Sequence, residues 1–235
     1  MVLNLIKKAY DATWGRYVFA GMYDRFLDKF EKAGLSEKRR EMLIPARGRT
    51  IELGTGTGLC LPYYPDAVSE LVLTEPYPHM VVKLQEKVQA LSAHKRRTQL
   101  VVAPAEQLPF EDGSFDTVVA SMILCTVRDP QNALKEITRV LKPDGQYLFL
   151  EHVRNPDPKI ARMQDLIQPG WYLFGNECHC NRPTVETLKK YPSLVVEDLK
   201  YDKIPAARKF IEAMIIGRAR KAPNPAATAD AACTC

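Results

Sequence analysis

The chain has 235 residues, 46% of them hydrophobic, and a formal net charge of +5. It is long enough for one substantial core, and no apolar run approaches the ~20 residues that a membrane-spanning helix needs. The basic residues form short clusters, such as those at 38–40 and 95–97, which favours a solvated surface over a nucleic-acid or anionic-membrane partner. The N-terminus lacks the order of a secretory signal, so we expect a cytoplasmic protein with free thiols.

The first 45 residues carry aromatic and aliphatic side chains at helical intervals, from Tyr17 to Phe30. A second short helix is predicted to begin at Ser36. Such a stripe is typical of core packing, and the alternative is that Tyr17 and Tyr23 cover a ligand pocket. We expect residues 1–45 to form helices that cap the rest of the chain.

Residues 49–58 read Arg-Thr-Ile-Glu-Leu-Gly-Thr-Gly-Thr-Gly, which predicts a buried strand followed by a glycine-rich turn. Glycine lets a backbone turn sharply and lie against a ligand where a side chain would collide. We expect the N–H groups of the turn to face outward as a cradle for a polar ligand, with a helix following from about Leu59 or Pro62. A tight turn without a ligand is the alternative, because such a turn alone is a weak signal.

Glu75 ends the next apolar run, about 20 residues after Gly54, where an acidic residue can accept hydrogen bonds from a nucleoside ribose. The turn and Glu75 together indicate a nucleoside-containing cofactor. NAD fits poorly, because its Gly-x-Gly-x-x-Gly fingerprint would require a glycine where the chain has Leu59.

Strands and helices alternate from residue 50 onward. Strands are expected near 50–53, 70–74, 98–102, 115–121 and 146–151, and helices near 79–91 and 130–141. This alternation predicts a parallel sheet covered on both faces, with ligands at the carboxyl ends of its strands, where Glu75, Ser121 and His152 should converge.

The alternation breaks after His152. An inserted segment, 155–183, is predicted to contain a helix near 159–167 and to lie on the substrate side. A helix at 184–190 and strands near 194–201 and 212–220 would complete a seven-stranded sheet in a single domain spanning 1–221. The tail at 222–235, rich in Ala and Pro, is expected to be disordered.

Four motifs together resemble those of the class I S-adenosylmethionine-dependent methyltransferases. They lie at 52–58, 104–110, 115–121 and 141–145. A narrower resemblance, at 121–127, 149–153, 168–171 and 180–184, is to the alkyl-thiol S-methyltransferases, which share a layout with quinone and phospholipid methyltransferases. The resemblance implies an α/β, Rossmann-like, mostly parallel sheet and S-adenosyl-L-methionine as the cofactor. It departs at Pro104, where relatives often carry an acidic residue, so Ala105, Glu106 and Gln107 are expected to take over the adenine contact.

The resemblance also implies which residues contact each ligand. Cofactor contacts are expected from Glu52, Gly54, Thr55, Gly56, Gly58, Glu75, Pro76, Ala105, Glu106, Gln107, Ser121 and Met122. Acceptor contacts are expected from Tyr17, Tyr23, Leu124, Cys125, Trp171, Tyr172 and Arg182.

Methyl transfer from a sulfonium is an in-line displacement, so positioning is a large part of catalysis. A thiol acceptor is partly ionised at neutral pH, whereas a hydroxyl or ammonium acceptor requires a base. His152 is the candidate base, and a structural histidine is the equally weighted alternative. Cys125 is read as a wall of the pocket rather than a reactive thiol. No metal is expected, because Cys178-x-Cys180 is not a standard zinc spacing.

We therefore predict an enzyme that methylates the sulfur of a small molecule. The alternative within enzymes is C-, O- or N-methylation of a quinone, lipid or other natural product. A protein of a different class, which binds the cofactor without catalysis, is a further alternative. The oligomeric state is not predicted by the sequence.

Overall fold

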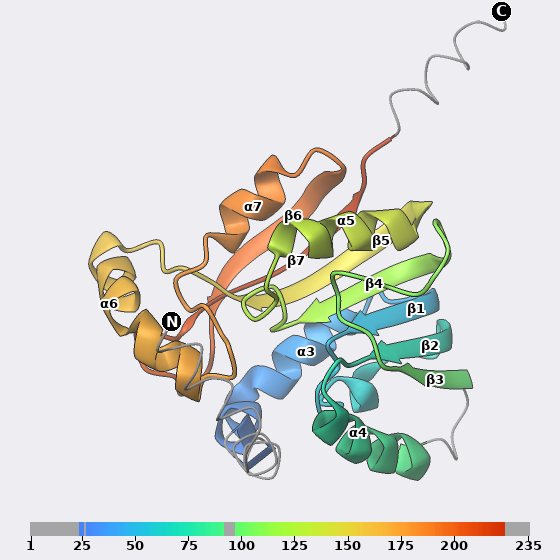
Figure 1. The fold of residues 1–235 in the computed structure, drawn as a ribbon, viewed down its shortest axis with the longest axis horizontal. Helices are drawn as coiled ribbons and strands as arrows, with labels where there is room; N and C mark the ends of the chain where they lie inside the picture. The colour runs from blue at the N-terminus through green and yellow to red at the C-terminus, as the bar shows by residue number, and fades with distance from the viewer. Residues whose placement is uncertain (1–23, 26, 92–96, 224–235) are drawn as a thin grey trace, which may run out of the picture.

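A computed structural model describes residues 24, 25, 27–91 and 97–223 (Figure 1). Tyr17, Tyr23 and the greater part of the 222–235 tail lie outside these described residues.

A seven-stranded sheet with the order β3-β2-β1-β4-β5-β7-β6 forms the centre of the molecule (Figure 1). Its strands are β1 (Gly48–Leu53), β2 (Val68–Thr74), β3 (Arg97–Val101), β4 (Phe115–Ser121), β5 (Leu141–His152), β6 (Leu194–Lys203) and β7 (Ala213–Lys221). β7 runs antiparallel to both of its neighbours, and the other pairs are parallel. The mostly parallel, seven-stranded sheet predicted from the sequence is thereby confirmed.

The strand order places a topological switch between β1 and β4. The chain leaves β1 to build β2 and β3 on one side, and then returns to build β4 on the other. Ile51 of β1 is level with Val72 of β2 and Val118 of β4, so the carboxyl ends of these strands lie close together. In open α/β sheets, ligands bind in the crevice outside such a switch point.

Helices cover both faces of the sheet. They are η1 (Glu31–Leu35), α3 (Ser36–Leu43), η2 (Leu61–Tyr63), α4 (Pro78–Leu91), α5 (Pro130–Val140), α6 (Pro158–Phe174) and α7 (Thr184–Lys190). Apolar side chains of α5 and α7 pack on the face that carries Ile51 and Val118. Those of α3 and α4 pack on the opposite face, which carries Leu71 and Val119. The alternation of side chains along each strand explains why one strand supplies both cores.

The start of α5 shows how local sequence determines an element. The Asp129 carboxylate accepts hydrogen bonds from the backbone N–H groups of Gln131 and Asn132, and Pro130 occupies the first turn. These are the preferred residues for an N-cap and a first helical position. The helix predicted from Asp129-Pro130 is confirmed.

Two expected helices differ from the structure. The glycine turn is followed by turns and the short η2 rather than by an α-helix, because Tyr64 is extended before Pro65, as a residue preceding proline tends to be. In contrast, α6 continues past residue 167 and through Pro169 to Phe174. Hydrogen bonds from Gln164 and Gln168 to the following loop support the helix on the N-terminal side of this proline.

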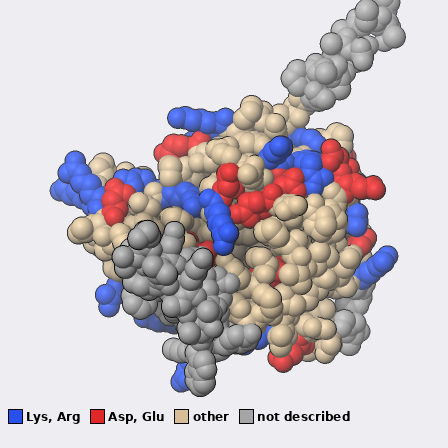
Figure 2. Space-filling model, viewed as in Figure 1, with Lys and Arg blue, Asp and Glu red and all other residues tan. Residues whose placement is uncertain are grey.

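Charged side chains of both signs are interspersed on the face shown in Figure 2. Several are paired, including Arg139 with Asp112 at 2.8 Å and Lys142 with Asp116 at 2.6 Å. Within the described residues, no helix combines the length and apolar character of a membrane span.

Candidate functional site

A cavity of about 650 Å³ opens beyond the carboxyl ends of the parallel strands. Its lining includes Gly54 after β1, Glu75 after β2, Ser121 at the end of β4 and His152 at the end of β5. Its volume lies within the range of about 300–1,000 Å³ that is usual for small-molecule sites. The structure thus brings together in one crevice the strand-end residues singled out in the sequence.

The three glycines of the turn have different surroundings. A Cβ added at Gly54 would lie 2.3 Å from Ile123 Cδ1, and one at Gly58 would lie 2.6 Å from Leu61 Cδ1. A Cβ added at Gly56 would meet nothing within 4 Å, although its φ of +59° disfavours any other residue. Gly56 therefore presents bare backbone to open space beside the cavity, whereas Gly54 and Gly58 permit packing inside the protein.

The expected outward-facing cradle is wrong for three N–H groups of the turn. Thr55 donates to the carbonyl of Thr74 at 2.9 Å, and Gly58 donates to the carbonyl of Thr55 at 3.0 Å. The N–H group of Gly56 donates to Glu75 Oε2 at 2.8 Å. The N–H groups of Thr55 and Gly56 hold the turn against Thr74 at the end of β2 and Glu75 after it, and the N–H group of Gly58 closes the turn on itself. These three N–H groups are therefore engaged within the protein.

The Glu75 carboxylate is hydrogen-bonded to the backbone of the turn. Its two oxygens accept hydrogen bonds from the backbone N–H groups of Gly56 and Tyr77, at 2.8 and 3.0 Å. Burial raises the pKa of Glu75 above its usual value, and these two hydrogen bonds oppose the rise. A carboxylate oxygen can accept more than one hydrogen bond, so Glu75 can still accept from a ligand in the cavity that it lines.

A second charged cluster forms the floor of the cavity. Glu52 is fully buried, accepts a hydrogen bond from the Tyr64 hydroxyl at 2.8 Å, and has a pKa raised by burial to about 7. Arg39 of α3 pairs with Glu31 and donates to the Ser121 hydroxyl. Arg39 was not among the predicted site residues, because an arginine on a short polar helix carries no signal that it reaches a distant cavity.

The loop after β3 lines the opposite wall through Ala105, Glu106 and Gln107. Glu106 Oε1 accepts a hydrogen bond from the N–H group of Arg128 at 2.9 Å. Its carboxylate therefore ties this loop to the residues just before α5. Ala105 and Gln107 line the same wall on either side of Glu106.

The loop at 123–127, which follows β4, is held by charged groups on two sides. The buried Glu151 accepts hydrogen bonds from the N–H groups of Ile123 and Leu124 at 3.2 and 3.0 Å, and burial raises its pKa to about 8. Arg182 donates to the carbonyl groups of Leu124 and Val127, the latter at 2.8 Å. This loop carries Cys125 into the cavity wall.

Several expected ligand contacts do not line the cavity. Leu124 is packed in the core, Arg182 is occupied by the carbonyl groups of the 123–127 loop, and the Tyr172 ring lies against His179 at 5.1 Å. Gly58 faces Leu61 rather than the cavity. The other predicted cofactor residues line the cavity, as do Cys125, His152 and Trp171 on the acceptor side.

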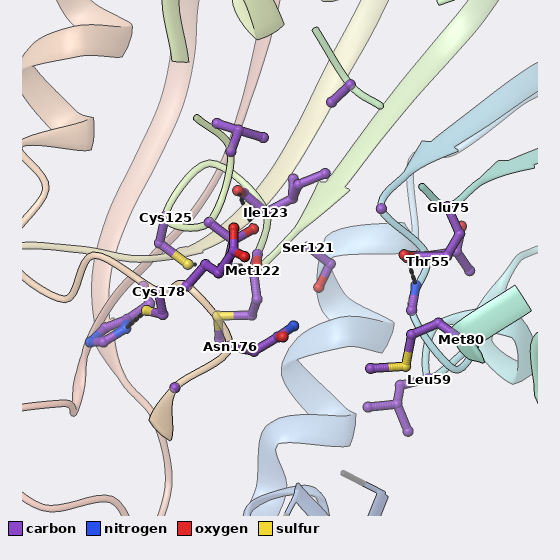
Figure 3. A pocket seen from close by; sticks show the side chains of 18 of the residues that line it. Thr55, Leu59, Glu75, Met80, Ser121, Met122, Ile123, Cys125, Asn176 and Cys178 are labelled. Carbon is purple, nitrogen blue, oxygen red and sulfur yellow. Dashed lines mark hydrogen bonds between the residues drawn. The ribbon is translucent and has the colours of Figure 1, made fainter. Parts of the chain in front are cut away.

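Two cysteines and one histidine meet at that end of the cavity, in a group that we call the sulfur cluster: Cys125, His152 and Cys178. His152 Nδ1 lies 3.2 Å from Cys178 Sγ, and one ligand atom from each residue lies within 4.8 Å of the others. Figure 3 shows Cys125 and Cys178 directed toward each other across the cavity wall. A hydrogen bond from Cys125, together with His152, lowers the pKa of Cys178, whereas the same bond and burial raise the pKa of Cys125.

Cys178 was not among the predicted site residues. In the sequence, Cys178 stands out only as half of Cys178-x-Cys180. In the structure, Cys180 turns away, and its sulfur lies 3.2 Å from Gln168 Oε1 of α6. The partners of Cys178 are instead 26 and 53 residues distant along the chain, and no short motif could reveal them.

The sequence and the fold of this chain are similar to those of known methyltransferases. Residues 51–149 match a family described as Methyltransferase domain. The human protein Thiol S-methyltransferase TMT1B is 33% identical over 199 residues, which cover 80% of this chain and 80% of the relative. The Phosphatidylethanolamine N-methyltransferase of Cereibacter sphaeroides is 30% identical over 82% of this chain and 93% of its own. A crystal structure of a SAM-dependent methyltransferase from Thermotoga maritima has a TM-score of 0.63 at 22% identity, covering 88% of this chain and 97% of the other, which shows a shared fold.

Proposed function

We propose that this chain, which belongs to the class I S-adenosylmethionine-dependent methyltransferases, transfers the methyl group of S-adenosyl-L-methionine to the sulfur of a small thiol. The observation that carries the thiol assignment is the sulfur cluster at the end of the cavity opposite Glu75 (Figure 3). The thiol S-methyltransferase relative supports the same assignment.

The cofactor would occupy the part of the cavity between the glycine turn and the loop after β3. Glu75 would accept hydrogen bonds from the ribose hydroxyl groups, since its oxygens line the cavity and retain accepting capacity. The bare backbone at Gly56 would let the ligand approach closely. Glu52 and Arg39 place one acidic and one basic side chain on the floor, which suits the ammonium and carboxylate of an amino-acid moiety.

Ala105 and Gln107 would face the adenine. When bound, the cofactor supplies an electrophilic methyl group, and the chain's own contribution is to hold that carbon in line with an acceptor.

A thiol acceptor requires no general base from the residues at the sulfur-cluster end of the cavity. At this end of the cavity, the Glu151 carboxyl group is engaged by backbone N–H groups and His152 Nδ1 is in contact with Cys178. His152 Nε2 is buried and has no hydrogen-bond partner among the described residues. A hydroxyl or amine acceptor would need a free and well-placed base. A thiol near its ordinary pKa of about 8.5 is partly ionised at neutral pH and is a strong nucleophile. The base role of His152 is therefore not required by this reaction.

A second candidate is methylation of a phospholipid or quinol. It is favoured by the similarity to the phosphatidylethanolamine enzyme over most of both chains. It is also favoured by apolar side chains in the cavity wall, including Leu27, Phe30 and Leu35.

The two candidates are separated by incubating the full-length protein with S-adenosylmethionine and matched acceptors. 2-Mercaptoethanol, ethylene glycol and ethanolamine differ only in the nucleophilic atom, and phosphatidylethanolamine vesicles and a quinol complete the panel. We expect mass spectrometry to detect one added methyl group on the thiol alone. Methylated lipid or quinol without methylated thiol would establish the second candidate. Cofactor binding with no methylated product would indicate a binding protein.

A further inference from the structure

The sulfur cluster has a composition that neither the cofactor nor a wall of the pocket explains. Cys125, His152 and Cys178 come from three separate segments, the loop after β4, the end of β5 and the loop after α6. All three residues are buried and all three line the cavity. Cysteine alone can serve as a small apolar wall residue, but the buried imidazole of His152 is polar and requires partners.

We infer that Cys125, His152 and Cys178 bind a zinc ion whose fourth coordination position faces the acceptor end of the cavity. Two cysteine sulfurs and one imidazole are a ligand set that zinc uses in catalytic sites, where three protein ligands leave one position open. Soft thiolate ligands select zinc over magnesium or calcium, which prefer oxygen.

The distances within the cluster are close to those that zinc would impose. With zinc–sulfur bonds of about 2.3 Å and a zinc–nitrogen bond of about 2.0 Å, tetrahedral ligand atoms stand roughly 3.5–3.8 Å apart. His152 Nδ1 is already 3.2 Å from Cys178 Sγ, and the three ligand atoms lie within 4.8 Å of one another. Side-chain adjustments of about 1 Å would therefore complete the site, without movement of the backbone.

Hydrogen bonds to neighbouring segments hold the backbone that carries the two cysteines. The N–H group of His179 donates to the carbonyl of Cys125 at 2.8 Å, so the two cysteine-bearing loops are joined directly. Gln168 of α6 donates to the carbonyl of Cys178 at 3.3 Å. Arg182 and Glu151 hold the loop that carries Cys125 from its carbonyl and N–H sides. Such support is what a metal site needs if its ligands are to hold a defined geometry.

The open position gives the zinc a role in the proposed reaction, and this part of the inference rests on the proposed function. An acceptor thiol, R–SH, would bind zinc as R–S⁻ and release its proton to solvent. A sulfur lone pair would then form a bond to the methyl carbon, while the carbon–sulfonium bond breaks and its electron pair stays on the departing sulfur. The product is a neutral thioether, R–S–CH₃, which is a weaker zinc ligand than a thiolate and can leave the site.

Binding is tested on the untagged, full-length protein after reduction and removal of metal by a chelator. Zinc is titrated in competition with a chromophoric chelator, and cobalt(II) is used as a spectroscopic substitute. We expect one equivalent per chain, with thiolate-to-cobalt charge-transfer bands and the intense visible absorption of a tetrahedral site. A weak octahedral cobalt spectrum, or no stoichiometric zinc, would overturn the inference.

Variants assign the ligands. Cys125→Ser and Cys178→Ser should each weaken zinc binding by more than about 100-fold, since loss of a mere supporting residue already costs 10–100-fold. Cys180→Ser is the matched control, because Cys180 is also buried and near Cys178, but its sulfur contacts Gln168. It should retain the wild-type cobalt spectrum. Equal loss in all three variants, or none in Cys125→Ser, would contradict the assignment, and the wild-type spectrum remains informative if a variant fails to fold.

Activity measurements separate this inference from the proposed function. Removal of zinc should lower thiol methylation at least tenfold while the affinity for the cofactor changes little. Undiminished thiol methylation by the metal-free protein would overturn the zinc role and leave the proposed function intact. A zinc-loaded protein that methylates no thiol would overturn the proposed function and leave the metal site intact.

Discussion

Substitution of Gly56 by alanine separates the contribution of the glycine turn to folding from its contribution to ligand binding. The new methyl group would meet no protein atom within 4 Å, so the folding penalty comes from the backbone alone. A φ of +59° is unfavourable for alanine by about 1–2 kcal/mol. The same methyl group would project toward the space assigned to the cofactor. We expect a loss of affinity of at least tenfold, or about 1.4 kcal/mol, in addition to the change in stability.

Gly113→Ala is the matched control. Gly113 has a φ of +63°, and the closest heavy atom to an added Cβ is Lys142 Cα at 4.0 Å. It does not line the cavity. Both variants should therefore lose a similar free energy of unfolding, measured by urea denaturation, whereas only Gly56→Ala should weaken the binding of S-adenosylhomocysteine in calorimetry. Unchanged affinity in Gly56→Ala, or an equal loss in Gly113→Ala, would refute the reasoning.

Three further predictions follow from buried charges. Glu75→Ala should weaken cofactor binding by about 30-fold or more, because hydrogen bonds to a charged group contribute about 1.5–3 kcal/mol each. Glu70 lies within β2, pairs with Arg49 and does not line the cavity. Glu70→Ala should therefore leave calorimetric affinity unchanged, and a similar loss in both variants would contradict the ribose assignment. Burial raises the pKa of Glu52 from 4.5 to about 7, so its contribution to stability is present below pH 4.5 and is lost as pH rises through 7, a change of up to about 3 kcal/mol. Glu52→Gln should remove this decline, and parallel curves of unfolding free energy against pH for the two proteins would exclude it. Arg182→Lys should raise the KM for the thiol about tenfold with little change in cofactor affinity, because one ammonium cannot span the two carbonyl groups that the guanidinium holds. An unaltered KM would show that these two hydrogen bonds do not position the 123–127 loop for the acceptor.

Local sequence was sufficient for most elements of the fold. β4 is a mostly apolar, largely buried run that begins and ends at the predicted residues. The edge strands β3 and β6 are more polar and more exposed. α5 was recognisable from Asp129-Pro130, because a cap and a fixed φ act within a few residues of each other.

Predictions that depended on distant contacts were less successful. The helix expected after the glycine turn is absent from the described chain, since Pro65 restricts Tyr64 to an extended backbone. α6 extends through Pro169, although a proline usually interrupts a helix. Contacts from Gln168 to Cys178 support it, and such contacts are invisible in a sequence window around the proline.

The candidate site also contains residues that local sequence predicted and residues that only distant contacts bring into it. Gly54, Gly56 and Glu75 were found because a turn and the next strand place them together whatever the rest of the chain does. The predicted place of Cys125 in the pocket wall is also found in the structure. Arg39 and Cys178 could be assigned only from the structure, as could the diversion of Arg182 from the acceptor to two backbone carbonyl groups.

The sequence by itself determined a parallel sheet, a glycine turn at its switch point and an acidic residue one strand further on. These depend on periodicity and on backbone geometry over a few residues, both of which are written in the local order of side chains. Only the tertiary structure decided what lies at the end of the cavity opposite Glu75, where ligand atoms of Cys125, His152 and Cys178 lie within 4.8 Å of one another. Their proximity results from the packing of two loops against the end of β5, and the free energy of that packing is distributed over the whole core rather than over any motif.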